Sequence, residues 1–251
     1  MKKKGLIIGI IIAIVTIVIV VGCVAIYIAK GFTQELAIKE EIQAIDQITN
    51  VTDLQTIDME AFNQKTDSVV TTGDYAIVEQ AVKQYIKDSV NYTVEVNALL
   101  QDETMTNLVT AENYQTDGPD FVQTTTYITE TKAKLEEAKN EFSNMFTEEK
   151  IMSYIDGKTD KQKFIDLYKE VAIGNQTELI PQEELETVQS SLDDVINILN
   201  IEQEMIDLLK NNSGKWQIQN DMVMFSSNDA LTEYNSLVGQ LQTAAMQLSL
   251  K

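Results

Sequence analysis

Apolar residues recur every three or four positions along most of this chain, the spacing that places them on one face of an α-helix. The clearest stretch begins at Gly73-Asp74 and ends near Leu100. Its apolar stripe consists of Ile77, Val78, Ala81, Val82, Tyr85, Ile86, Val90, Val94 and Leu100. Further long helices are predicted at about residues 33–49, 53–70, 119–146 and 182–210, with one more that closes the chain. The pattern therefore predicts an all-α fold, a bundle of helices with apolar inner faces.

Short polar segments with glycine or proline separate these helices. Gly118 suits the end of a short helix, and Pro119 suits the first turn of the next one. Thr147 and Thr159 are the expected N-caps of two further short helices, the second of which ends at Gly174. The breaks are therefore predicted from residue types that stop or start a helix.

One segment departs from the helical pattern. The sequences KWQIQ (residues 215–219) and MVMF (residues 222–225) flank Asn220-Asp221, which suits a two-residue hairpin turn. Trp216 and Ile218 alternate with polar neighbours, as strand residues with one buried face do. Two strands alone are marginally stable in water, so we expect this small C-terminal β-hairpin to pack on helices.

The amino-terminal run is uniformly apolar. Residues 5–29 carry no charge. As a helix they would span about 37 Å, more than the roughly 30 Å of a bilayer's hydrocarbon core. We therefore expect a single transmembrane helix, a signal-anchor whose partner is the lipid bilayer.

Lysines set the expected orientation of this anchor. Three of them, at residues 2–4, precede the apolar run, whereas only Lys30 follows it directly. Positive charge stays preferentially on the cytoplasmic side, so the amino terminus is expected there. This divides the chain into an anchor at residues 1–30 and an acidic, extracytoplasmic helical domain at residues 31–251.

Cleavage at the single cysteine is the alternative. The run Val20-Val21-Gly22-Cys23 fits loosely the lipobox of bacterial lipoproteins, in which the cysteine is acylated. The residues after Cys23 (VAIYIA) stay apolar, and the whole run is longer than the roughly 7–15 apolar residues of a signal peptide. Cys23 is therefore a candidate lipidation site, while an uncleaved helix is the favoured interpretation.

Composition excludes several classes of function. The formal net charge is −20, and all 19 basic residues are lysine, because the chain has neither arginine nor histidine. From Lys30 onward, 16 lysines face 39 acidic residues, a balance of −23 that repels nucleic acid. Without histidine, and with its one cysteine in the anchor, the outer domain has no Ser-His-Asp or Cys-His pair, no imidazole or thiolate metal ligand and no disulfide. No catalytic residue, cofactor site or metal site is therefore predicted.

Carboxylates are the remaining candidates for chemistry. Adjacent acids occur at Glu40-Glu41, Glu136-Glu137, Glu148-Glu149, Glu183-Glu184 and Asp193-Asp194. Neighbouring residues on a helix point about 100° apart, so such pairs are interpreted as solvated helix surface. Asp117 and Asp120 bracket a turn, but their spacing matches no EF-hand loop, and helix capping accounts for such residues equally well.

The hairpin and the helix after it contain the densest group of aromatic and methionine side chains. Methionine-rich and aromatic surfaces often bind partners, although such residues more often seal a hairpin onto a core. The candidate partner patch consists of Trp216, Met222, Met224, Phe225 and Tyr234.

The same region resembles a known family. Residues 222–227 (MVMFSS), followed by residues 233–237 (EYNSL), resemble the C-terminal part of an uncharacterised family of bacterial lipoproteins, a domain of unknown function. The DYAI sequence at residues 74–77 is similar to a segment near the middle of those proteins. The resemblance implies an envelope protein held at a membrane by its amino terminus, and it transfers no catalytic residue.

These observations favour a non-enzymatic cell-envelope protein that binds an unknown protein partner or organises the cell surface. A sensor or small-ligand-binding module is the second hypothesis, and it would need a cavity with converging polar groups. A carboxylate-based hydrolase is the third, and a buried carboxylate cluster would be its first sign.

Overall fold

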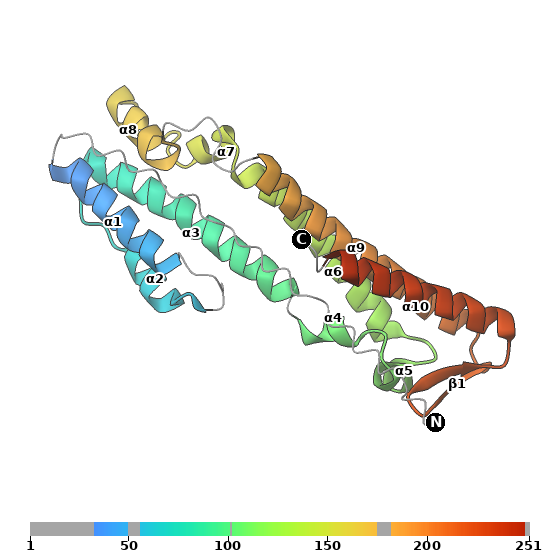
Figure 1. Ribbon diagram of the computed structural model, residues 1–251. Coiled ribbons are helices and arrows are strands. Elements are labelled where there is room, and N and C mark those ends of the chain that lie inside the picture. The colour runs from blue at the N-terminus through green and yellow to red at the C-terminus, as the bar shows by residue number, and fades with distance from the viewer. Residues whose placement is uncertain (1–32, 50–55, 101, 175–181, 249–251) are drawn as a thin grey trace. The chain divides into compact units, whose positions relative to one another are not determined.

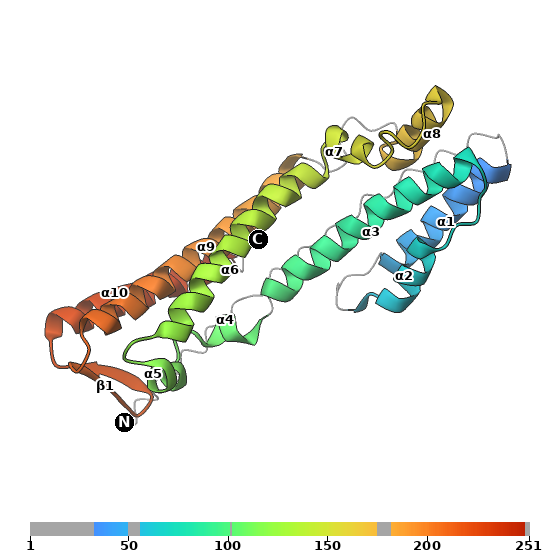
Figure 2. The same ribbon diagram turned by 180° about the vertical axis from the view of Figure 1, so that it is seen from behind.

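The structure, a computed structural model, describes residues 33–49, 56–100, 102–174 and 182–248. It is mostly helical, with one antiparallel β-hairpin near the carboxyl end, so the predicted all-α class and the hairpin are confirmed (Figures 1 and 2). The described residues form two compact units. Unit 1 comprises residues 98–139 and 187–248, and unit 2 comprises residues 33–97, 140–174 and 182–186, each within the described ranges. The single boundary predicted at residue 31 stays a prediction.

Unit 2 is built from short and long helices around one apolar core. It contains α1 (Thr33–Thr49), α2 (Met59–Asp67), most of α3 (Asp74–Leu100), α7 (Glu148–Ser153) and α8 (Gln162–Ala172). Its core includes Ile38, Ile45, Phe62, Val78, Val82, Ile151 and Tyr168. Apart from Leu100, which belongs to unit 1, the amphipathic stripe predicted for α3 faces this core, as its spacing requires.

Unit 1 combines three long helical segments with short ones and the hairpin. The long elements are most of α6 (Val122–Met145), most of α9 (Gln182–Asn211) and α10 (Asn228–Leu248). These three helices run side by side in both ribbon views (Figures 1 and 2). The short helices are α4 (Glu103–Asn107) and α5 (Ala111–Asp117), and the strands are β1 (Trp216–Gln219) and β2 (Met222–Phe225). The core of unit 1 includes Phe121, Ile128, Leu135, Leu199, Ile206, Leu209 and Leu241.

Several helix boundaries match the sequence prediction because local chemistry sets them. Thr147 accepts a hydrogen bond from the Lys150 N–H and caps α7, as predicted. The turn residues Asn220 and Asp221 both have positive φ (51° and 60°), the conformation that a tight hairpin turn requires. Gly174 also follows the end of α8 with φ at 69°.

Three boundaries differ from the prediction. The helix expected at 53–70 covers only Met59–Asp67 among the described residues, since Asp58 caps its start and Ser68 is extended. The helix expected from residue 119 begins at Val122, because Phe121 has φ at 50° and cannot continue a right-handed helix. The cap expected at Thr159 falls outside α8, which starts at Gln162.

Candidate functional sites

The hairpin is fastened to unit 1 by aromatic side chains on its inner face. The Trp216 ring stacks on Phe121 with centroids 6.1 Å apart, and it meets Tyr114 edge-on at 6.4 Å. The indole N–H donates to the backbone carbonyl of Leu209 at 2.9 Å. On the other strand Phe225 lies against Tyr234 of α10, with centroids 5.6 Å apart. These contacts place one face of the hairpin firmly on helices α5, α9 and α10.

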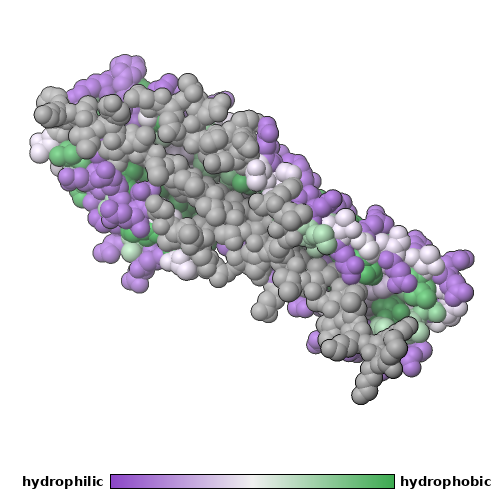
Figure 3. Space-filling model, in the orientation of Figure 1, coloured by the Kyte–Doolittle hydropathy of each residue, from purple (hydrophilic) through white to green (hydrophobic). Residues whose placement is uncertain are grey.

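Strand register determines what the other face presents. The cross-strand pairs are Trp216 with Phe225 and Ile218 with Val223 on the inner face, and Gln217 with Met224 and Gln219 with Met222 on the outer face. Met222 and Met224 remain 49% and 40% exposed. The outer face therefore presents two methionines beside two glutamines. Figure 3 shows hydrophobic side chains over the end of α10 that follows the hairpin.

The candidate partner patch is thus divided between two environments. Trp216, Phe225 and Tyr234 point into unit 1, and Tyr234 is only 8% exposed, with its hydroxyl 3.2 Å from that of Tyr114. Met222 and Met224 point outward. Period-two alternation in the sequence carried the signal for this division, because residues of one strand alternate between faces.

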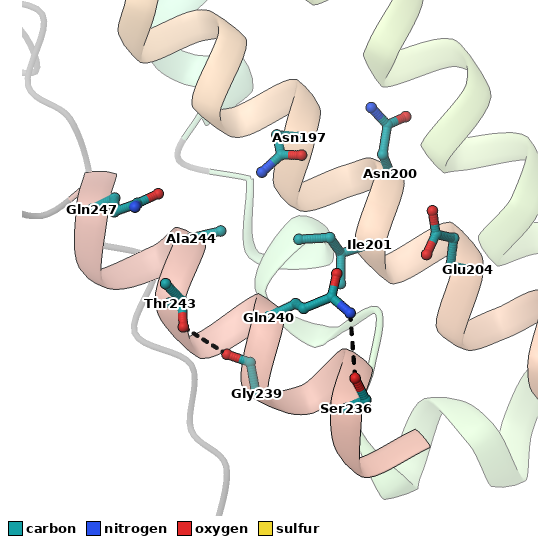
Figure 4. Close-up of a pocket in the computed structure, with 10 residues that line it drawn as sticks. All are labelled: Asn197, Asn200, Ile201, Glu204, Ser236, Gly239, Gln240, Thr243, Ala244 and Gln247. Atoms are coloured by element: carbon teal, nitrogen blue, oxygen red, sulfur yellow. Dashed lines mark hydrogen bonds between the residues drawn. The ribbon is translucent and has the colours of Figure 1, made fainter. Parts of the chain in front are cut away.

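A groove lies between α9 and α10. It has a volume of about 500 Å³. The lining residues recur every three or four positions along both helices, on the faces that meet at the groove (Figure 4). They are Asn197, Asn200, Ile201, Glu204, Ser236, Gly239, Gln240, Thr243, Ala244 and Gln247. Most of these side chains are uncharged and polar. Sequence reasoning missed this groove, because residues about forty positions apart come together only when the two helices pack.

Glu202 is a buried acid on the inner side of α9. Its residue is 2% exposed, and its Oε2 atom has no hydrogen-bond partner among the residues that the structure describes. Burial raises the pKa of Glu202 to about 8, so the carboxyl is protonated at neutral pH. Tyr114 and Tyr127 lie close enough to Glu202 for its charge to raise the pKa of each phenol further, beyond the larger effect of burial. The surroundings of Glu202 are therefore phenolic and apolar.

A second buried acid, Glu79 in unit 2, is fully paired. Its carboxylate accepts hydrogen bonds from the backbone N–H groups of Val70 and Thr71, from the Thr71 hydroxyl and from the Lys83 ammonium at 2.7 Å. Burial alone would raise the pKa of Glu79, but these donors outweigh it and hold the pKa below its usual value. Lys83 is 1% exposed and also contacts Glu41 at 2.8 Å.

This network corrects one expectation from the sequence. Glu40-Glu41 is not simply solvated surface, because Glu41 bridges Lys83 and Lys65 while Glu40 is exposed. Lys83, which pairs with both Glu41 and Glu79, is itself buried. Its i, i+4 spacing from Glu79 was a visible signal, but nothing local indicates that the pair is buried.

Among the residues that the structure describes, no paired acid or turn carboxylate belongs to a group that could hold a metal ion. Within residues 33–49, 56–100, 102–174 and 182–248, no group of three acidic side chains is placed to hold a metal ion. Glu136, Glu137, Glu148, Glu149 and Asp193 are exposed, as predicted. Asp117 accepts from the N–H groups of Gln123 and Thr124 and so caps the start of α6.

The predicted transmembrane helix at residues 5–29, including Cys23, lies outside the described residues. Among the helices from α1 to α10, none is both long and apolar enough to span a membrane. The anchor, its orientation and the lipidation of Cys23 stay predictions.

Comparison with known proteins finds no protein family, curated protein or solved structure that matches this chain. The resemblance of residues 216–241 to a lipoprotein family likewise stays a prediction.

Proposed function

We propose that this chain is a membrane-anchored, non-enzymatic protein of the cell envelope that binds a protein partner through the outer face of its hairpin. The observation that carries the proposal is the exposure of Met222 and Met224 on a hairpin whose opposite face is fixed by Trp216 and Phe225. Methionine side chains are flexible and polarizable, and they adapt to the shape of a partner.

The fixed mounting matters for binding energy. A loop that must become ordered on binding loses conformational entropy, and that loss subtracts from the affinity. The paired strands and the stacked Trp216 hold the outer face in one conformation before any partner arrives. Binding a partner therefore requires little further loss of conformational entropy from the hairpin.

The two buried acids fit a non-catalytic protein. Glu79 is neutralised by Lys83 and lies in unit 2, whereas Glu202 is a single acid in the core of unit 1. Acid/base chemistry on a substrate commonly needs two carboxyls in one accessible site. Glu79 has Glu41 as a neighbour across Lys83, but Glu79 and Glu202 are 0% and 2% exposed, so neither is accessible to a substrate.

The test places a photocrosslinking amino acid at position 222 of the full-length chain in living cells, and the same amino acid at position 246 as a control. Met246 is 65% exposed but lies on α10 rather than on the hairpin. A discrete crosslinked protein should form from position 222 alone. The crosslinked protein is then purified, and its affinity for the full-length chain is measured. Combining Met222→Gln and Met224→Gln in the chain should weaken this binding at least about tenfold relative to the wild type, a loss of about 1.4 kcal/mol.

Two results would contradict the proposal. The first is equal crosslinking from positions 222 and 246. The second is an affinity of the double variant for the partner that is unchanged, or lowered no more than by the control Met246→Gln. Protease added to intact, wall-stripped cells tests the proposed topology separately, since an extracytoplasmic domain should be cleaved without breaking the membrane.

A further inference from the structure

The groove between α9 and α10 has uncommitted hydrogen-bonding groups. Among the described residues, the side chains of Asn197, Asn200 and Gln247 make no hydrogen bond, and Gln240 makes only a long one, 3.5 Å from its Nε2 to the Ser236 hydroxyl. In Figure 4 Gln240 and Ile201 lie side by side between the two helices. Each side-chain amide carries two donor hydrogens and an acceptor oxygen in one plane.

The floor of the groove lets a ligand come close to the helices. Ile201 and Ala244 are 7% and 5% exposed and form its apolar base. At Gly239 nothing lies within 4 Å of the position that a β-carbon would occupy, so this part of the helix surface is open.

Charge narrows the class of ligand. Of the ten lining residues only Glu204 is ionisable, and none is a lysine. The described residues of unit 1 hold five lysines and sixteen acidic residues, a formal charge of −11. An anionic ligand would meet repulsion without any compensating cation, and an apolar ligand would cover the exposed amides without pairing them.

We propose that the α9–α10 groove binds a neutral carbohydrate. Vicinal hydroxyl groups both donate and accept hydrogen bonds, and they match the amides of Asn197, Asn200, Gln240 and Gln247 along the two helices. The apolar face of a sugar ring would lie over Ile201 and Ala244. The volume of about 500 Å³ lies within the range of about 300–1,000 Å³ that is typical of small-ligand sites. This inference does not depend on the hairpin's binding a protein.

The experiment uses the full-length chain in lipid nanodiscs, which avoids detergents with sugar headgroups. Saturation-transfer NMR is recorded with maltotetraose, cellotetraose, chitotetraose and the acidic tetragalacturonate. At least one neutral oligosaccharide should receive magnetisation from the protein, and tetragalacturonate should not. Gln240→Leu should weaken the binding about tenfold, the effect of losing hydrogen bonds worth about 1.4 kcal/mol.

Gln242→Leu is the matched control, because Gln242 is an exposed glutamine on the same helix outside the groove. Asn197→Ala, at an exposed position on α9, provides a second groove variant should Gln240→Leu fail to fold. The proposal is overturned if no neutral oligosaccharide binds, if tetragalacturonate binds equally well, or if the groove variants and the control bind alike.

Discussion

Ionising the buried carboxyl of Glu202 should destabilise unit 1, and Glu202→Gln should remove that effect. The pKa of Glu202 is about 8 in the folded protein, against 4.5 for an ordinary glutamate. Because the unfolded chain loses this proton at a lower pH, the folded state gains its full advantage only below about pH 4.5. That advantage declines as the pH rises, and it is gone once the pH has passed through about 8.

The size of the effect follows from the two pKa values. Each unit of pKa difference is worth 1.36 kcal/mol, so the free energy of unfolding should fall by about 4 kcal/mol between about pH 5 and about pH 9. For a chain of this length 1 kcal/mol moves the melting temperature by about 2–4 °C. The loss of about 4 kcal/mol should therefore lower the melting temperature by about 8–16 °C.

The assay follows melting of the full-length chain by circular dichroism at both pH values, for the wild type and for Glu202→Gln. Other groups titrate identically in both proteins, so the difference between their pH dependences isolates Glu202. Tyr114 and Tyr234 do not interfere, because burial raises the pKa of each phenol above its usual value near 10. Parallel melting-temperature curves for the two proteins would refute a neutral, buried Glu202.

Three further predictions concern packing and charge. Trp216→Ala should lower the free energy of unfolding by about 3 kcal/mol, because it removes the stacking on Phe121 and the hydrogen bond to the Leu209 carbonyl. Trp216→Phe should cost less. A melting-temperature shift under about 2 °C for the alanine variant would contradict this prediction. Gly118→Ala should also be destabilising in thermal melts, because a methyl group there would lie 2.4 Å from the Tyr114 carbonyl oxygen and 3.3 Å from the Trp216 ring; an unchanged melting temperature would show that this approach is looser. Lys83→Met should lower the free energy of unfolding, measured by chemical denaturation, by about 3–5 kcal/mol, because it removes the counter-charge of the buried Glu79. Lys65→Met, at the exposed end of the same network, should lower it by under about 1 kcal/mol. Equal losses for the two variants would argue against the buried pair.

The sequence by itself determined the elements whose causes are local. The apolar spacing of α3 requires only that one face be buried, and the Asn220-Asp221 turn requires only residues that tolerate positive φ. Alternation along β1 also indicated that Trp216 and Ile218 share a face. These features depend on neighbours within a few positions, so pattern reasoning reached them.

Only the tertiary structure decided the environment of each polar side chain. Glu79 and Glu202 both lie on long helices that carry other acids, and neither position looks unusual in the sequence. Other segments pack over them, with Val70 and Thr71 over Glu79 and tyrosines near Glu202, while Lys83 on the same helix supplies the counter-charge of Glu79. The carboxylate with donors has its pKa lowered, whereas the one without them has its pKa raised.

The groove between α9 and α10 has the same origin. Asn197 and Gln240 are ordinary surface amides when each helix is considered alone, and they form a shared lining only when the helices lie together. Helix packing joins residues that are distant in the chain, and the free energy of that packing comes from apolar contacts rather than from the amides themselves. The sequence pattern of one helix therefore cannot predict this groove.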